Sequence, residues 1–187
     1  MDKTVRSWIV EILESRRSVI TIAVRQRAKF EGWLKFELAA HAEKSGASNV
    51  EVEASKESTQ AHERSDITFY LQGARYDLEL KTPNTNWRST GIETKTRPIT
   101  KNIESIVQDV KKLQDSVGQG IVAFVLFPIP PRDHRWTDYL RRIAVETGIP
   151  VSEKQHCSCV SVSLEGEVSA DLIVCCFAVP RHVLPAT

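Results

Sequence analysis

Apolar residues recur at helical spacing in four parts of the chain. The first stretch predicts an amphipathic helix over residues 3–17. The same period predicts helices over residues 27–44, 101–115 and 136–147. Residues 19–24 are apolar and rich in β-branched side chains, so they fit either a short strand or a continuation of the first helix.

Elsewhere the pattern changes to the alternation of a half-buried strand. It does so over residues 49–55, 66–71 and 76–81, and the last two are separated by a turn at Gly73-Ala74. These two segments therefore predict a hairpin with one apolar face. Residues 121–127 form an uninterrupted apolar run, which is typical of a strand covered on both faces.

The order of these elements predicts an α/β fold with a mixed central sheet flanked by helices. A final antiparallel pair is expected over residues 156–164 and 171–179. We expect a single domain over residues 1–187, since this length suits one core. Its centre would be residues 27–147, with a helical N-terminal extension (1–26) and a C-terminal β extension (148–187).

Composition and charge narrow the class of protein. The chain is 41% hydrophobic and 26% charged, and its formal net charge of +1 argues against binding of nucleic acid by bulk charge. No apolar run approaches the roughly 20 residues of a membrane span, and the N-terminus lacks a signal-peptide pattern. Four cysteines near the C-terminus do not form a disulfide framework, so we expect a cytoplasmic protein without a membrane partner.

The polar face of the predicted hairpin brings charged groups together. A turn at Gly73-Ala74 pairs Asp66 with Lys81 and Thr68 with Glu79, so two carboxylates and an ammonium share one face. Hard oxygen ligands for a divalent cation, with a cation beside them, suit phosphodiester hydrolysis. The alternative is a solvated face with a weak surface ion pair.

A carboxylate on the preceding helix adds to this pattern. The apolar side chains of residues 30–40 place Glu37 near the centre of one helix face, where a carboxylate needs a metal or an ion pair. An ion pair with arginine or lysine is therefore the alternative. Glu31 lies at the margin of the face and is expected to be solvated. His41, one turn further along, is either a supporting partner or a satisfied core histidine.

The segment that follows Lys81 is polar and long. Residues 82–100 predict an exposed loop, and loops of this length in compact domains are often functional. Between residues 81 and 101 the chain has five basic residues against one acid, a net charge of +4 that leaves −3 for the rest. The side chains suited to phosphates and bases are Asn84, Asn86, Trp87, Arg88, Lys95, Arg97 and Lys101. Alternatively, the Trp87 ring folds back over the core.

Two polar residues on the next helix could also reach nucleic acid. Gln108 and Lys112 lie one turn apart. An ordinary exposed glutamine is the alternative for Gln108. His156 and the cysteines Cys157, Cys159, Cys175 and Cys176 could form a zinc cluster, but their spacing is unusual for zinc and strand cysteines are commonly buried small hydrophobes.

The order helix, three strands, helix, buried strand resembles the αβββαβ core of the PD-(D/E)XK, or restriction-endonuclease-like, nuclease superfamily. The resemblance covers residues 27–147 and rests on Asp66 followed by Glu79-Leu80-Lys81, with Glu37 upstream. Ser65 stands where the family name implies proline. The resemblance implies that Asp66, Glu79, the Leu80 carbonyl and Glu37 bind Mg²⁺, for which Mn²⁺ can substitute, and that Lys81 positions or deprotonates the attacking water.

The resulting expectation is a metal-dependent DNA nuclease, an endonuclease of restriction, repair or recombination type. A homodimer would suit double-strand cutting. The alternative is an inactive module of the same fold that binds nucleic acid or a protein partner.

Overall fold

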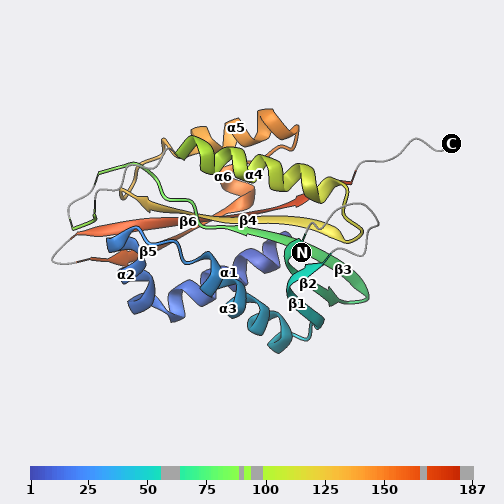
Figure 1. Ribbon diagram of the computed structural model, residues 1–187. Coiled ribbons are helices and arrows are strands. Elements are labelled where there is room, and N and C mark those ends of the chain that lie inside the picture. Colours follow the sequence, from blue (N-terminus) through green and yellow to red (C-terminus); the bar gives the residue numbers. More distant parts are fainter. Residues whose placement is uncertain (56–63, 89–90, 94–98, 165–167, 182–187) are drawn as a thin grey trace.

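A mixed β-sheet forms the middle layer of the molecule. The computed structural model describes residues 1–55, 64–88, 91–93, 99–164 and 168–181. Within them, six strands are arranged in the order β1-β2-β3-β4-β6-β5 (Figure 1). The strands are β1 (Ser48–Ser55), β2 (Arg64–Leu71), β3 (Ala74–Lys81), β4 (Gln119–Ile129), β5 (Cys157–Ser163) and β6 (Ser169–Val179). β3 and β4 are parallel, and the other neighbouring strands are antiparallel.

Helices cover both faces of the sheet. They are α1 (Asp2–Ser15), α2 (Arg17–Gln26), α3 (Glu31–Lys44), α4 (Ile99–Gln114), α5 (Thr137–Thr147) and the short α6 (Glu153–His156). α1, α2 and α3 lie on one side, and α4, α5 and α6 lie on the other (Figure 1). The α/β class and the mixed sheet flanked by helices are therefore confirmed, and residues 19–24 are helical. None of the helices in the described part of the chain has the length and apolar character of a membrane span.

Strand β4 joins the two hydrophobic layers. Its alternate residues Ile121, Ala123, Val125 and Phe127 pack with α1, α2 and α3, whereas Val122, Phe124 and Leu126 pack with α4 and α5. All seven are at most 1% exposed. The continuous apolar run of the sequence thus belongs to a strand buried on both faces, as predicted.

The C-terminal strands are part of this central sheet rather than an appendage to it. β6 lies between β4 and β5, pairing antiparallel with both. Its side chains also alternate between the layers, with Val174 and Cys176 on one side and Cys175 and Phe177 on the other. The expected strand pair is present, and β6 lies inside the sheet, where it contributes to both hydrophobic layers.

The hairpin of β2 and β3 has a different register from the predicted one. Leu71 pairs with Ala74 and Thr68 with Asp77, so the turn is Gln72-Gly73, with positive φ at both residues. Such a two-residue turn matches the twist of a hairpin. The predicted pairing was shifted by two positions, and an even shift leaves each side chain on the same face. Asp66 consequently lies beside Glu79 rather than Lys81.

Candidate active site

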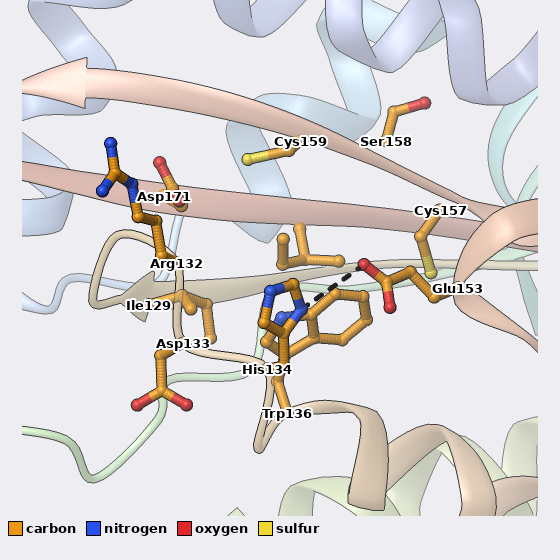
Figure 2. Close-up of a pocket in the computed structure, with 11 residues that line it drawn as sticks. Ile129, Arg132, Asp133, His134, Trp136, Glu153, Cys157, Ser158, Cys159 and Asp171 are labelled. Atoms are coloured by element: carbon orange, nitrogen blue, oxygen red, sulfur yellow. Dashed lines mark ion pairs between the residues drawn. The ribbon is translucent and has the colours of Figure 1, made fainter.

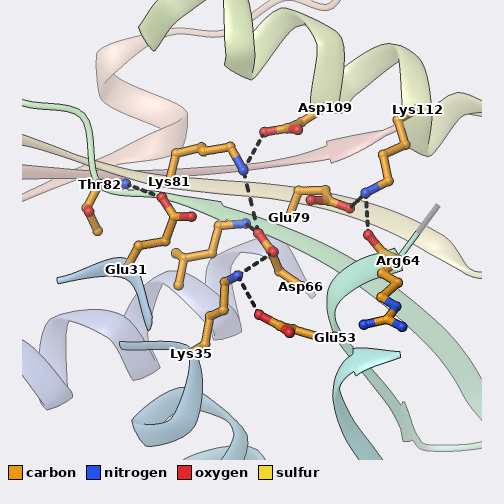
Figure 3. A network of polar contacts seen from close by, with 11 residues as sticks. Glu31, Lys35, Glu53, Arg64, Asp66, Glu79, Lys81, Thr82, Asp109 and Lys112 are labelled. Carbon is orange, nitrogen blue, oxygen red and sulfur yellow. Dashed lines mark hydrogen bonds and ion pairs between the residues drawn. The ribbon is translucent and has the colours of Figure 1, made fainter. Parts of the chain in front are cut away.

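The charged face of the β2–β3 hairpin holds a compact group of acids and lysines (Figure 3). Asp66 comes from β2, and Glu79 and Lys81 come from β3. Lys81 Nζ lies 3.7 Å from Asp66 Oδ2, and the backbone N–H of Leu80 donates to the same oxygen at 2.8 Å. The structure therefore brings together the three hairpin side chains that the sequence singled out.

Both helical layers add residues to this group. Lys35 of α3 places its Nζ 2.6 Å from Asp66 Oδ1, and Lys112 of α4 places its Nζ 2.6 Å from Glu79 Oε1. Asp109 of α4 lies 3.2 Å from Lys81 Nζ. Lys112 also donates to the Arg64 carbonyl. The site is thus an alternating network of carboxylates and ammonium groups at the end of the hairpin, between α3 and α4 (Figure 3).

Burial shifts the acid–base equilibria of this network. Desolvation raises the pKa of Glu79 to about 7, with Lys112 opposing the shift and the Asp66 charge adding to it. Desolvation likewise raises the pKa of Asp109. For Lys81, burial lowers the pKa, but Asp109 and Asp66 together raise it above its ordinary value. Lys81 is therefore a stable cation at neutral pH.

Glu37 does not belong to the site. Its carboxylate pairs with Arg16 at 3.7 Å and its side chain is 30% exposed. Together with His41 it lines a separate cavity of about 430 Å³ on the α1 side. The His41 ring contacts Trp8 at a tilt, with ring centroids 5.6 Å apart. The predicted inward direction of Glu37 is wrong, and Glu37 forms an ion pair with Arg16 that is partly exposed rather than buried.

The buried face of α3 explains this correction. It consists of Leu34, Lys35, Leu38, Ala39 and Ala42. Ala40, which the prediction placed on this face, is exposed. Glu31 precedes Leu34 by three residues and Lys35 by four, so it lies on the true inner face. Its Oε2 accepts the backbone N–H of Thr82 at 3.3 Å, next to Lys81. Glu31 is the helix glutamate near the site, although the sequence indicated a solvated residue.

The segment after Lys81 begins as buried chain rather than as an exposed loop. Thr82 and Thr85 are each 1% exposed, and Thr85 N donates to the Phe127 carbonyl at 2.8 Å. Asn84 is 9% exposed and donates through Nδ2 to the Arg27 carbonyl. Asn84 is thus engaged by the protein itself rather than presented at the surface, and its contact with nucleic acid stays a prediction.

Arg27 holds the next part of this segment in place. It adopts a left-handed backbone conformation (φ 48°) after α2 and is 4% exposed. Its guanidinium donates to the carbonyls of Thr85, Trp87 and Glu93. The Trp87 ring lies 6.1 Å from Tyr139 and beneath the Arg135 guanidinium. The ring packs over the core, which was the alternative to stacking on bases.

The remaining predicted nucleic-acid contacts divide into three groups. Asn86, Arg88 and Lys101 are exposed, so they are free to meet a ligand. Gln108 is exposed on the side of α4 that faces away from its apolar stripe, so it does not join the network. Lys95 and Arg97 lie outside the described residues.

The donor set is chemically suited to magnesium. Asp66 and Glu79 are hard oxygen donors on adjacent strands, and Mg²⁺ commonly takes one or two carboxylates and keeps several waters. Burial of Glu79 at 2% exposure, with its raised pKa, also favours a cation at this position. However, no three His, Cys, Asp or Glu side chains of the described residues form a ready metal-binding group. A metal here would be held by carboxylates that already pair with Lys35 and Lys112.

The cysteines and a second cavity lie elsewhere. Cys175 and Cys176 are buried, and Cys157 and Cys159 are free thiols on β5. His156 Nδ1 accepts the Ser152 N–H. A cavity of about 150 Å³ is bounded by the β4–α5 connection, α6 and the β5–β6 pair (Figure 2). It shares no residue with the network around Asp66, so it does not extend the candidate active site.

Searches of the chain against family models, curated proteins and solved structures return no match.

Proposed function

We propose that the protein is a metal-dependent nuclease that hydrolyses DNA phosphodiester bonds, built on a restriction-endonuclease-like core. The order α3, β1, β2, β3, α4, β4 supports this αβββαβ assignment. The observation that carries the proposal is the juxtaposition of Asp66 and Glu79 with Lys81, on one face of adjacent strands and largely buried. Buried charges are costly unless they are paired or bind a metal, and clusters of this kind are concentrated at functional sites.

The residues would take distinct roles in this reaction. Asp66, Glu79 and the Leu80 carbonyl would hold Mg²⁺ or Mn²⁺, with Glu31 in place of Glu37 as the helix glutamate. A divalent cation held there supplies Lewis-acid charge for hydrolysis of a phosphodiester. Lys81 acts as a donor that orients water and stabilises developing negative charge, because its raised pKa keeps it protonated. This argues against Lys81 as the general base.

Plasmid cleavage with matched variants tests this proposal. We expect Glu79→Gln and Lys81→Met to lose Mg²⁺-dependent cleavage by about 100-fold or more, as expected for loss of electrostatic stabilisation at a reacting centre. The exposed residues Glu51 and Lys111 supply the controls Glu51→Gln and Lys111→Met, which should cleave at the parental rate. Chelation by EDTA should abolish activity in every case. Undiminished cleavage by Glu79→Gln would contradict the proposal.

A second function is favoured by one specific observation. Lys35 and Lys112 already satisfy the carboxylates of Asp66 and Glu79, as expected of a nuclease-like module that binds DNA or a protein without cleaving it. Such a module would bind DNA with an affinity that falls with salt and does not depend on Glu79. Absence of cleavage with Mg²⁺ and Mn²⁺, together with unchanged DNA binding by Glu79→Gln, would favour this function over the nuclease.

A further inference from the structure

Each carboxylate on the hairpin that could bind a metal forms an ion pair with a lysine outside the Glu-x-Lys motif. Lys35 Nζ lies 2.6 Å from Asp66 Oδ1, and Lys112 Nζ lies 2.6 Å from Glu79 Oε1 (Figure 3). Both are close contacts between opposite charges. These two lysines reach the carboxylates from opposite layers of the molecule, α3 and α4.

Both carboxylate oxygens of Asp66 already have close partners. One of its oxygens accepts from Lys35 and the other accepts the Leu80 backbone N–H at 2.8 Å. The Lys35 side chain is only 11% exposed and also lies 3.7 Å from Glu53. Lys112 is held similarly, because it donates to the Arg64 carbonyl as well as pairing with Glu79.

A divalent cation and these ammonium groups exclude one another. A metal ion on the same carboxylate oxygen would come close to the lysine charge, and the repulsion between them is weakly screened in a buried site. Binding of the metal therefore requires that the lysines move away.

We infer that Lys35 and Lys112 are resident counter-ions that compete with a divalent cation for Asp66 and Glu79, and so weaken metal binding by the free protein. This inference rests on the metal site of the proposed function. It predicts that removal of either lysine tightens metal binding. Removal of a lysine that supports the metal-bound site would instead weaken it. The displaced ammonium groups become available to phosphate oxygens, so metal and DNA should assist each other's binding.

Calorimetric titration with Mn²⁺ tests the inference without measuring activity. Lys35→Met and Lys112→Met should each bind Mn²⁺ about tenfold or more tightly than the parent, because a charge-assisted hydrogen bond no longer has to be broken. Lys44→Met on α3 and Lys111→Met on α4 are matched controls, since both lysines are exposed and close to the helix ends, and they should bind like the parent. Asp66→Asn should abolish binding.

Circular dichroism establishes that each variant is folded, and Lys35→Gln replaces Lys35→Met if the latter does not fold. Mn²⁺ affinity that is unchanged or weaker in both lysine variants would overturn the inference, as would failure of every variant to bind Mn²⁺. Tighter binding without DNA cleavage by any protein would support the inference and contradict the nuclease. Cleavage of DNA by the parent, with Mn²⁺ affinities unchanged in the lysine variants, would support the nuclease and overturn the inference.

Discussion

Glu79 combines almost complete burial with an ionisable group. Its side chain is 2% exposed, and desolvation raises its pKa to about 7 despite the nearby Lys112 ammonium. A folded-state pKa above the ordinary value of 4.5 means that the folded protein binds more protons than the unfolded chain between about pH 4.5 and 7. The free energy of unfolding contributed by this group therefore falls as the pH rises through that window.

Replacement of Glu79 by glutamine should remove this pH dependence. The parent loses the contribution of Glu79 as the pH rises, whereas Glu79→Gln does not. The free energy of unfolding of Glu79→Gln minus that of the parent should therefore be about 3 kcal/mol larger at pH 8 than at pH 5, since each pKa unit is worth about 1.4 kcal/mol. Urea denaturation of both proteins at the two pH values measures the difference. Glu51→Gln, which changes an exposed glutamate, should show no such gain. An equal stability difference at both pH values would contradict the assignment of Glu79 as the buried titrating group.

The hairpin residues of the site could be predicted from sequence, but the helix residues could not. Strand alternation has a period of two, so Asp66, Glu79 and Lys81 share a face even when the register is displaced by two positions. The predicted buried face of a helix, in contrast, depends on which side chains are counted as apolar. Lys35 was counted as polar although its stem is buried, and this rotated the predicted inner face of α3 toward Glu37.

Asp109 was missed for a related reason. It lies three residues after Ile106 and four before Leu113, at the edge of the apolar stripe of α4. A carboxylate at that edge was detectable in the sequence. Its pairing with Lys81 was not detectable, because the packing of α4 beside β3 is a tertiary contact.

At the scale of elements, the connection from β3 to α4 depends on one buried arginine. Arg27 donates to three carbonyl groups, those of Thr85, Trp87 and Glu93. Its planar guanidinium can satisfy several acceptors at once, which a lysine ammonium cannot do with the same geometry. This role was not predictable from the sequence, because the contacts are made to backbone atoms whose positions depend on the fold.

We expect Arg27→Ala to lose about 3 kcal/mol of folding free energy, because it leaves buried carbonyl groups without a donor. Arg27→Lys should lose less. The control is Arg17→Ala, which removes an exposed pair with Glu14 and should change stability by under about 1 kcal/mol. Urea denaturation gives all three values. Equal stability of Arg27→Ala and Arg17→Ala would show that the connection does not depend on this guanidinium.

At the scale of the whole molecule, β6 decides where the folding unit ends. The sequence places a core within residues 27–147 and treats the C-terminal strands as an addition. In the structure β6 covers the edge of β4 and contributes to both hydrophobic layers. Local patterns identify strands but not their order in a sheet, so the central position of β6 was not predictable from periodicity.

A fragment containing only residues 27–147 is therefore expected not to fold cooperatively. It would expose the edge of β4 that pairs with β6, together with the apolar side chains of β4 that pack with α1 and α2. A chain of residues 1–181 keeps every described element and should show the same urea transition as the full chain. Near-UV circular dichroism and urea titration compare the three proteins. A cooperative transition with native-like near-UV signal in the fragment would instead place both terminal regions outside the folding unit.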